Sequence, residues 1–131
     1  MRTRVSLPAS EAGLVLAIRV ARAFAAQCGL CATAADRLCV VVEEWLSNVV
    51  EHGEPAPGSR LMMRLERDEG GLHATFTDAG QAFDPRHTPA FEGPNTERGG
   101  GAGLELVRAW AEIADYRYTR GRNRLVLRVT T

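Results

Sequence analysis

The stretch EEWLSNVVEHG, residues 43–53, places polar side chains within an otherwise apolar helical segment that begins with three consecutive valines. Glu44, Asn48 and His52 are spaced four residues apart, and residues at that spacing are offset by about 40° around a helix. These three side chains are therefore expected to form one slightly spiralling stripe. A stripe of this kind is by itself typical of the solvated edge of an amphipathic helix, so its meaning depends on the rest of the chain.

The composition is that of one soluble globular domain. The chain has 131 residues, of which 45% are hydrophobic and 24% charged, a balance typical of a globular domain rather than of a disordered tail or a membrane protein. Its formal net charge is 0, so no overall field favours nucleic acid or anionic lipid. All 16 basic residues are arginine, and the absence of lysine excludes a P-loop. With neither a secretory signal nor an apolar run that could cross a bilayer, a cytoplasmic location is expected.

The cysteines predict neither a disulfide framework nor a metal site. Cys28, Cys31 and Cys39 are odd in number, and the Cys28–Cys31 CxxC has no second pair or histidine to complete a zinc tetrahedron. We expect them to be reduced packing residues near a helix end.

Apolar periodicity and turn residues predict the order of the elements. In the first half we expect a strand at Arg2–Leu7, followed by a helix that is capped by Ser10 and stops at Gly29. A second helix would run from a Thr33/Asp36 capping box to His52 and end at Gly53. Residues 60–67 and 72–78 would then form a hairpin. The second half reads as a long turn-rich loop over residues 79–103, a helix at Leu104–Ala114, and strands at residues 116–120 and 124–130 joined by a turn at 121–123.

This order predicts an α+β fold. Residues 1–131 would form one domain, a two-layer α/β sandwich with helices on one face of a mostly antiparallel mixed sheet. A structureless loop of this length in a compact domain is usually functional, so we interpret its middle, about residues 85–100, as a lid.

Two glycine-containing segments flank the loop. Asp78 ends a predicted strand and is followed by Gly80, where the chain bends or allows a close approach to its backbone. The sequence GGGAG at residues 99–103 comes immediately before a predicted helix, where free backbone N–H groups and the helix dipole favour an anion such as phosphate. Each segment alone is more often only a turn.

Together with the stripe, these segments meet the needs of a magnesium nucleotide. Such a ligand requires an oxygen ligand for Mg²⁺, backbone donors for phosphates and an acceptor for an exocyclic amine, and transfer chemistry adds a base. The candidates are Asn48 as the Mg²⁺ ligand, the glycine segment as the phosphate donor, Asp78 as the acceptor for the amine, and Glu44 as the base.

The three segments resemble the motifs of a known family. They are similar to the three sequence boxes of the GHKL superfamily. The N box is matched by Glu44-x3-Asn48-x3-His52, the G1 box by Asp78-x-Gly80-x2-Phe83-Asp84, and the G2 box by the GGGAGL sequence at residues 99–104. The chain most resembles small freestanding members, the anti-sigma-factor serine kinases of bacterial partner-switching systems. The resemblance implies the Bergerat, or histidine-kinase-like ATPase, fold with bound ATP and Mg²⁺.

The resemblance also implies roles for individual residues. Asn48 would hold Mg²⁺, Glu44 would be the catalytic base, Asp78 would accept a hydrogen bond from the adenine amino group, and Gly80 would leave space for the ring. His52 would either support the site by hydrogen bonding or contact the ligand. The other cofactor-binding residues implied are Phe83, Arg98, Gly100, Gly101, Ala102, Gly103 and Leu104.

The roles of several further residues stay open. Arg86 and Arg98 border the lid and are candidates for a phosphate contact. The late-strand threonine of the family's adenine pocket matches Thr75, Thr77 or Thr130 equally well, and the first-helix arginine that relatives use for partner binding matches Arg19 or Arg22. His73 and His87 match no motif and are interpreted as a strand residue and a lid residue.

The function implied is that of an ATP-dependent protein serine/threonine kinase. It would act as an anti-sigma factor, bind a sigma factor, phosphorylate a serine on a STAS-type antagonist protein and form a homodimer. One alternative is a catalytic module of a two-component histidine kinase, disfavoured because no helix pair with a phosphoacceptor histidine is present. The other is a non-catalytic, nucleotide-gated binding protein.

Overall fold

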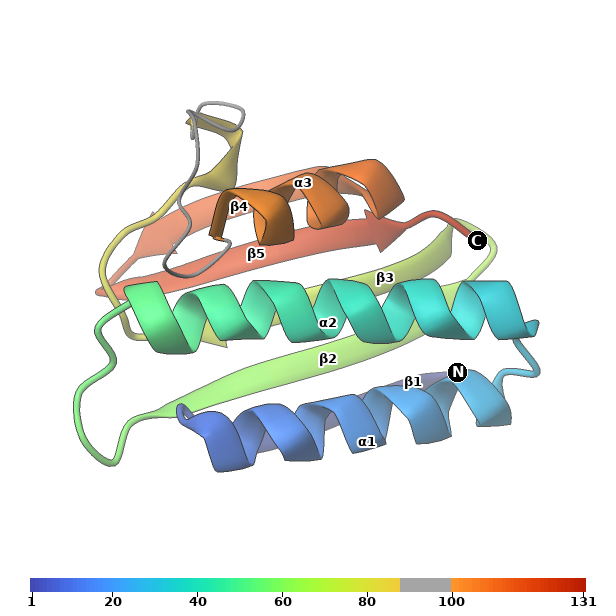
Figure 1. Ribbon diagram of the computed structural model, residues 1–131, viewed down its shortest axis with the longest axis horizontal. Coiled ribbons are helices and arrows are strands. Elements are labelled where there is room, and N and C mark those ends of the chain that lie inside the picture. The colour runs from blue at the N-terminus through green and yellow to red at the C-terminus, as the bar shows by residue number, and fades with distance from the viewer. Residues whose placement is uncertain (88–99) are drawn as a thin grey trace.

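The structure, a computed structural model, describes residues 1–87 and 100–131. In these residues three α-helices cover one face of a five-stranded sheet, with α2 between α1 and α3 (Figure 1). The predicted two-layer α/β fold is therefore confirmed. The elements are β1 (Arg2–Pro8), α1 (Glu11–Gln27), α2 (Ala32–His52), β2 (Arg60–Asp68), β3 (Gly71–Asp78), a 3-10 turn (Pro85–His87), α3 (Gly100–Trp110), β4 (Ala111–Thr119) and β5 (Arg122–Val129).

The sheet has the strand order β1-β2-β3-β5-β4. Every pairing among the described strands is antiparallel, so the prediction of a mixed sheet is wrong in that detail. Side chains alternate between the two faces of each strand. Met63, Phe76 and Leu125 lie side by side in register on the helix-covered face and are almost fully buried.

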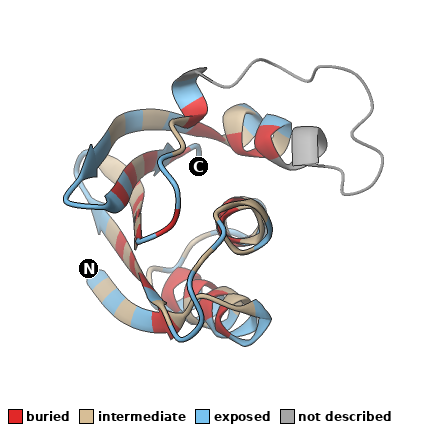
Figure 2. Ribbon diagram, turned by 90° about the vertical axis from the view of Figure 1, so that its left-hand side faces the viewer, coloured by how far each residue is buried: buried red, intermediate tan, exposed pale blue. Residues whose placement is uncertain are grey.

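Helix α2 supplies the centre of the hydrophobic core. Its buried residues recur every three or four positions and include Leu38, Val42, Trp45 and Val49. Figure 2 shows buried residues on all three helices and, along the strands, buried residues alternating with less buried ones. Burial of each large apolar side chain contributes about 1.5–3 kcal/mol, so this face fixes which side of α2 faces the sheet.

The helix boundaries agree only in part with the sequence pattern. The Ser10 hydroxyl caps α1 by accepting from the Gly13 N–H over 3.4 Å, and Gly53 is the C-cap of α2, as predicted. The predicted capping box is wrong: α2 starts at Ala32 after Cys31, which makes no side-chain cap hydrogen bond. Asp36 instead accepts a hydrogen bond from Arg22 of α1 over 2.8 Å.

The last helix is displaced from its predicted position. The pattern predicts Leu104–Ala114, whereas α3 spans Gly100–Trp110 and passes directly into β4. Residues 111–114 alternate between more and less buried positions, which is the period of a strand. β4 pairs with β5 on both sides of a register shift between Ile113 and Asp115. Cross-strand pairing therefore overrides the helix-forming composition of this segment.

The final hairpin turn is also displaced. Arg120 and Gly121, rather than residues 121–123, form the turn, and both have positive φ angles, 54° and 76°. This is the conformation of a two-residue type I′ hairpin. Asn123 consequently belongs to β5, where it is buried.

All three cysteines are free thiols. Cys39 is buried, Cys28 half-buried and Cys31 exposed, so packing accounts for only part of the set. Within the described residues, none of the helices has the length and apolar character required to cross a bilayer.

Candidate functional site

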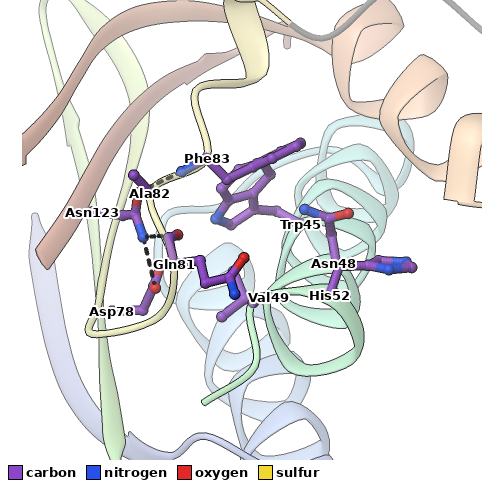
Figure 3. A pocket seen from close by; sticks show the side chains of 10 residues that line it. Trp45, Asn48, Val49, His52, Asp78, Gln81, Ala82, Phe83 and Asn123 are labelled. Carbon is purple, nitrogen blue, oxygen red and sulfur yellow. Dashed lines mark hydrogen bonds between the residues drawn. The ribbon is translucent and has the colours of Figure 1, made fainter.

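A pocket lies between the C-terminal half of α2 and the segment that follows β3 (Figure 3). Two walls come from elements far apart in sequence, and β5 contributes the floor. The lining residues are Trp45, Asn48, Val49, His52, Gly53, Asp78, Gln81, Ala82, Phe83 and Asn123. The sequence-predicted residues Asn48, His52, Asp78 and Phe83 are thus brought together.

Asp78 is a buried carboxylate with one oxygen engaged. Its side chain is at the end of β3 and the residue is 6% exposed. Oδ1 accepts hydrogen bonds from the Gly80 N–H over 2.9 Å and from Asn123 Nδ2 over 3.1 Å. Among the described residues, no donor bonds to Oδ2. The second oxygen can therefore accept from a ligand donor such as an exocyclic amine.

Asn123 organises the segment that Asp78 begins. Besides its bond to Asp78, Nδ2 donates to the Gln81 carbonyl over 2.8 Å, while Oδ1 accepts from the Phe83 N–H over 3.0 Å. The Tyr116 hydroxyl also donates to Oδ1, and burial raises the pKa of that phenol. Sequence reasoning missed Asn123 because it placed this residue in a turn. Extending the alternation of Leu125, Leu127 and Val129 back by one step would have placed it on the inner face.

Gly80 allows the loop to lie against the end of α2. A Cβ at this position would be 2.6 Å from the Gly53 carbonyl oxygen and 3.0 Å from Asp78 Oδ1. The next residue, Gln81, donates its N–H to the same Gly53 carbonyl over 3.0 Å. Gly80 itself does not line the pocket, so the space left by its missing side chain faces the helix end instead of the pocket.

One side of the pocket is apolar. Trp45 and Phe83 lie with ring centroids 6.0 Å apart and planes tilted by 32°, and Val49 lies next to them (Figure 3). The Trp45 Nε1–H is buried and has no hydrogen-bond partner among the described residues. This wall can contact a planar ring, and a buried unpaired donor at a pocket wall is a position where a ligand acceptor would relieve a desolvation penalty.

The polar stripe forms the opposite rim. Asn48 and His52 are half-buried on α2, across the pocket from Asp78 and Asn123 (Figure 3). In the described part of the chain, no three His, Cys, Asp or Glu side chains are grouped to hold a metal. An amide oxygen such as that of Asn48 suits Mg²⁺ when phosphates and water complete the coordination.

Glu44 lies one helical turn before Asn48 and does not line the pocket. Partial burial is the main cause that raises the pKa of its carboxyl group, and the nearby Glu43 and Glu51 carboxylates raise it further. A raised pKa strengthens a carboxylate as a proton acceptor.

The lid residues are only partly described. Arg86 donates to Asp84 through Nη2 over 2.7 Å and through Nε, and its guanidinium lies 5.7 Å from the centroid of the Tyr116 ring. Its predicted phosphate contact would have to replace or share this pairing. Arg98 lies outside the described residues.

The glycine segment belongs to a helix. Gly100, Gly101, Ala102 and Gly103 form the first turn of α3, not the loop before it, because α3 starts earlier than predicted. Gly99 lies outside the described residues. Leu104 is buried in the core and is not part of the pocket lining.

The structure places none of the three candidate threonines at the pocket. Thr75 and Thr77 lie on the face of the sheet away from the helices, and Thr130 is exposed beyond β5.

Comparison with known families identifies the fold. The sequence model of the family called histidine kinase-like ATPase domain matches residues 7–129. The chain therefore belongs to this family, which is part of the GHKL superfamily. A search of curated proteins found no match. Domains of this family bind ATP, usually with Mg²⁺, and membership points to ATP-dependent phosphotransfer as the general class of activity.

The residues present fit ATP. The free Oδ2 of Asp78 suits the adenine amino group, the Trp45–Phe83 wall suits the ring, and the orphaned Trp45 Nε1–H can donate to a ligand. Asn48 would hold the Mg²⁺ at the rim.

Proposed function

We propose that the chain is an ATP-dependent protein serine/threonine kinase acting as an anti-sigma factor in a partner-switching system. Its substrate would be a serine on a STAS-type antagonist, and its second partner a sigma factor. The observation that carries the proposal is the position of Glu44, one turn from Asn48, with its carboxyl pKa raised by burial and by Glu43 and Glu51.

The chemistry of the acceptor favours serine. A hydroxyl must lose its proton as it attacks phosphorus, so a carboxylate that accepts the proton assists the transfer. A neutral imidazole can attack through an unprotonated ring nitrogen and needs no such base. A carboxylate of raised pKa beside the predicted Mg²⁺ ligand therefore supports a hydroxyl acceptor over a histidine.

Each side chain has a limited task. Asp78 and the Trp45–Phe83 wall orient the adenine ring, Asn48 holds the metal near the phosphates, and Glu44 takes the hydroxyl proton. Bound Mg²⁺ supplies neutralisation of phosphate charge. Proton transfer to Glu44 requires the partner serine to approach the N-terminal side of Asn48.

Helix α1 offers a surface for the sigma factor. Of the two candidate arginines, Arg22 pairs with Asp36 over 2.8 Å, whereas Arg19 is exposed and makes no ion pair with the described residues. Exposed Val15 and Leu16 lie on the same helix, 51% and 44% exposed. We therefore assign the partner contact to Arg19, and we extend the proposal to a homodimer of the chain.

A transfer assay tests the proposal. The chain is incubated with radiolabelled Mg-ATP and the proteins that copurify with it, and labelled proteins are analysed for phosphoamino acids. We expect acid-stable phosphoserine on a partner with wild type and none with Glu44→Gln. Acid-labile phosphohistidine would instead support a histidine kinase module, and ATP binding without any transfer would support a nucleotide-gated binding protein.

A further inference from the structure

The sheet face away from the helices is rich in arginine. We call this surface the open face. Alternation along the strands places eight arginines there, namely Arg2, Arg4, Arg60, Arg64, Arg117, Arg122, Arg124 and Arg128. The same alternation places four carboxylates from the described strands on this face, those of Glu66, Asp68, Glu112 and Asp115. A chain of net charge 0 thus concentrates positive charge on one surface.

In one row of the open face, opposite charges lie on directly paired positions of neighbouring strands. Arg2 lies opposite Glu66 and Arg128 opposite Glu112, with N–O distances of 3.9 and 3.6 Å. Opposite charges at directly paired positions stabilise a sheet. This row therefore needs no ligand to account for it.

In the neighbouring rows, like charges lie on directly paired positions. Arg4 is the direct cross-strand partner of Arg64, and Arg117 is the direct partner of Arg124. Like charges at such positions are destabilising. Asp115 offsets the second pair, at 3.1 Å from Arg117 and 3.8 Å from Arg124. Among the described residues, the first pair has one contact to a carboxylate, that of Arg64 to Glu66 over 3.2 Å.

The Arg4–Arg64 pair has unused donors. Nε of Arg4 donates to the Met62 sulfur over 2.8 Å, and the described residues offer Arg4 no carboxylate. Nε of Arg64 is buried and has no hydrogen-bond partner in the described part of the chain. A guanidinium presents its donors as a planar fork that matches a carboxylate. Arg4 is exposed and the Arg64 side chain is 39% exposed, so the exposed parts of both guanidinium groups can donate to an anionic partner.

These side chains surround a hollow in the open face. Arg2, Arg4, Arg64 and Arg124 line it, around a floor of Met62, Thr75 and Thr77. In the part of the chain that the structure describes, this lining includes no carboxylate. The floor therefore combines a half-buried thioether with two hydroxyl donors, inside a ring of positive charge.

We propose that the open face docks a carboxylate-rich segment of a partner protein, centred on the Arg4–Arg64 pair. The partner's carboxylates neutralise the like-charged pairs, and its apolar atoms cover Met62. This surface lies on the opposite side of the sheet from the ATP pocket, so the inference does not depend on the proposed kinase activity.

The charges and the side chains on this face argue against other occupants. A second copy of the chain docked face to face would bring one arginine surface against another. Single-stranded nucleic acid is held by aromatic stacking as well as charge, and none of the open-face positions named above is aromatic. A membrane surface would gain little, since Met62 and Val126 are the large apolar side chains at these positions and both are half-buried.

Fluorescence anisotropy tests the proposal. The probe is a labelled peptide of alternating glutamate and serine, and the variant is Arg4→Gln/Arg64→Gln in the full chain. We expect wild type to bind and the double variant to lose at least about tenfold in affinity, the size of one charge-assisted hydrogen bond. Arg37→Gln on α2 removes one positive charge away from the open face and should bind like wild type.

Further arms keep the test decisive. Arg64→Lys preserves charge but removes the fork, so it should weaken binding, whereas unchanged binding would reject recognition by the guanidinium. Tighter binding of oligodeoxythymidylate or phosphatidylserine vesicles at the same ionic strength would overturn the assignment to a protein segment. A dimer seen in sedimentation that the double variant abolishes would assign the face to a second copy.

Folding must be separated from binding. Circular dichroism and ATP affinity are measured for each variant. If the Arg4→Gln/Arg64→Gln chain does not fold, Arg4→Gln alone replaces it, since among the described residues the one polar contact of the Arg4 side chain is to the Met62 sulfur. Undiminished peptide binding by that folded variant would overturn the proposal.

Discussion

Asn123 on β5 and Asp78 at the end of β3 are joined by a hydrogen bond of 3.1 Å from Nδ2 to Oδ1. The same amide group holds the Gln81 carbonyl and the Phe83 N–H. One buried side chain thus holds in place both the carboxylate expected to accept a hydrogen bond from adenine and the backbone segment that forms one wall of the pocket.

Asn123→Ala is therefore expected to disturb both stability and ATP binding. Removing the amide leaves the Gln81 carbonyl and the Phe83 N–H without this partner, which costs about 1–3 kcal/mol. Urea unfolding and calorimetric ATP titration measure the two effects. Tyr116→Phe, which removes only a hydroxyl from the same network, should cost less in both assays. Wild-type ATP affinity in Asn123→Ala would show that the loop is held by other contacts.

Asp78→Asn is expected to weaken ATP binding while preserving the fold. The amide oxygen can still accept from the Gly80 N–H, but the other position then carries a donor that faces the adenine amino group. Loss of a hydrogen bond to a charged group corresponds to about 1.5–3 kcal/mol, or roughly ten- to 150-fold in affinity.

A matched control exists for this substitution. Asp68 makes the same local bond in the β2–β3 hairpin, where Oδ1 accepts from the Gly70 N–H over 2.8 Å, compared with 2.9 Å at Asp78. Asp68→Asn should keep wild-type affinity for ATP. If calorimetry finds equal affinities for the two variants and wild type, Asp78 does not contact the base.

The sequence predicted the layers and four of the ten residues that line the pocket, because these depend on local patterns. The four-residue spacing of the α2 stripe placed Asn48 and His52 on the pocket rim, and strand alternation placed Asp78 at a buried strand end. Asn123 was not predictable in the same way. Its role depends on β5 pairing with β3, 45 residues away in sequence.

The displaced α3 boundary has a similar cause. Residues 111–114 carry a composition compatible with a helix, and only pairing with β5 makes them a strand. The glycine segment was misplaced by the same shift, since α3 begins at Gly100.

Glu44→Gln is expected to raise stability slightly at neutral pH while stopping phosphoryl transfer. Burial and the neighbouring carboxylates raise the pKa of Glu44 in the folded state. The protonated form is therefore favoured by folding, so wild type loses stability as the pH rises through that raised pKa. The neutral glutamine avoids this loss, with a gain of no more than about 0.5 kcal/mol for a partly exposed side chain.

The pH dependence provides the check. Unfolding by urea is followed for both proteins from neutral pH downward, and the difference should disappear below about pH 4.3, where the unfolded carboxyl is also protonated. Glu43→Gln serves as the neighbouring control and should retain transfer. Transfer by Glu44→Gln at the wild-type rate would remove Glu44 from the role of base.

Trp45 should report ATP binding through its fluorescence. The chain has two tryptophans, and only Trp45 lines the pocket, so a bound base should change the emission of that indole. Trp110→Phe should keep the response to ATP and Trp45→Phe should lose it. A response that survives Trp45→Phe and vanishes in Trp110→Phe would mean that the signal arises at α3.

Gly80→Ala is expected to damage the site through the backbone. The added Cβ would meet the Gly53 carbonyl oxygen at 2.6 Å, so the loop and the end of α2 must move apart. The shift also strains the bond from the Gln81 N–H to that carbonyl. Overpacking of this kind costs about 1–3 kcal/mol.

Gly70→Ala separates this effect from the general cost of replacing a loop glycine. Its Cβ would approach two side chains and no backbone atom of the described residues, Asp68 Oδ1 at 3.2 Å and His73 Cε1 at 3.7 Å. A smaller loss of stability and unchanged ATP affinity are therefore expected. Urea unfolding and calorimetry compare the two variants. Gly80→Ala should be less stable and bind ATP more weakly, because Asp78 and Phe83 lie at the two ends of the displaced loop. Equal behaviour of the two variants would show that the close contact between Gly80 and Gly53 does not shape the pocket.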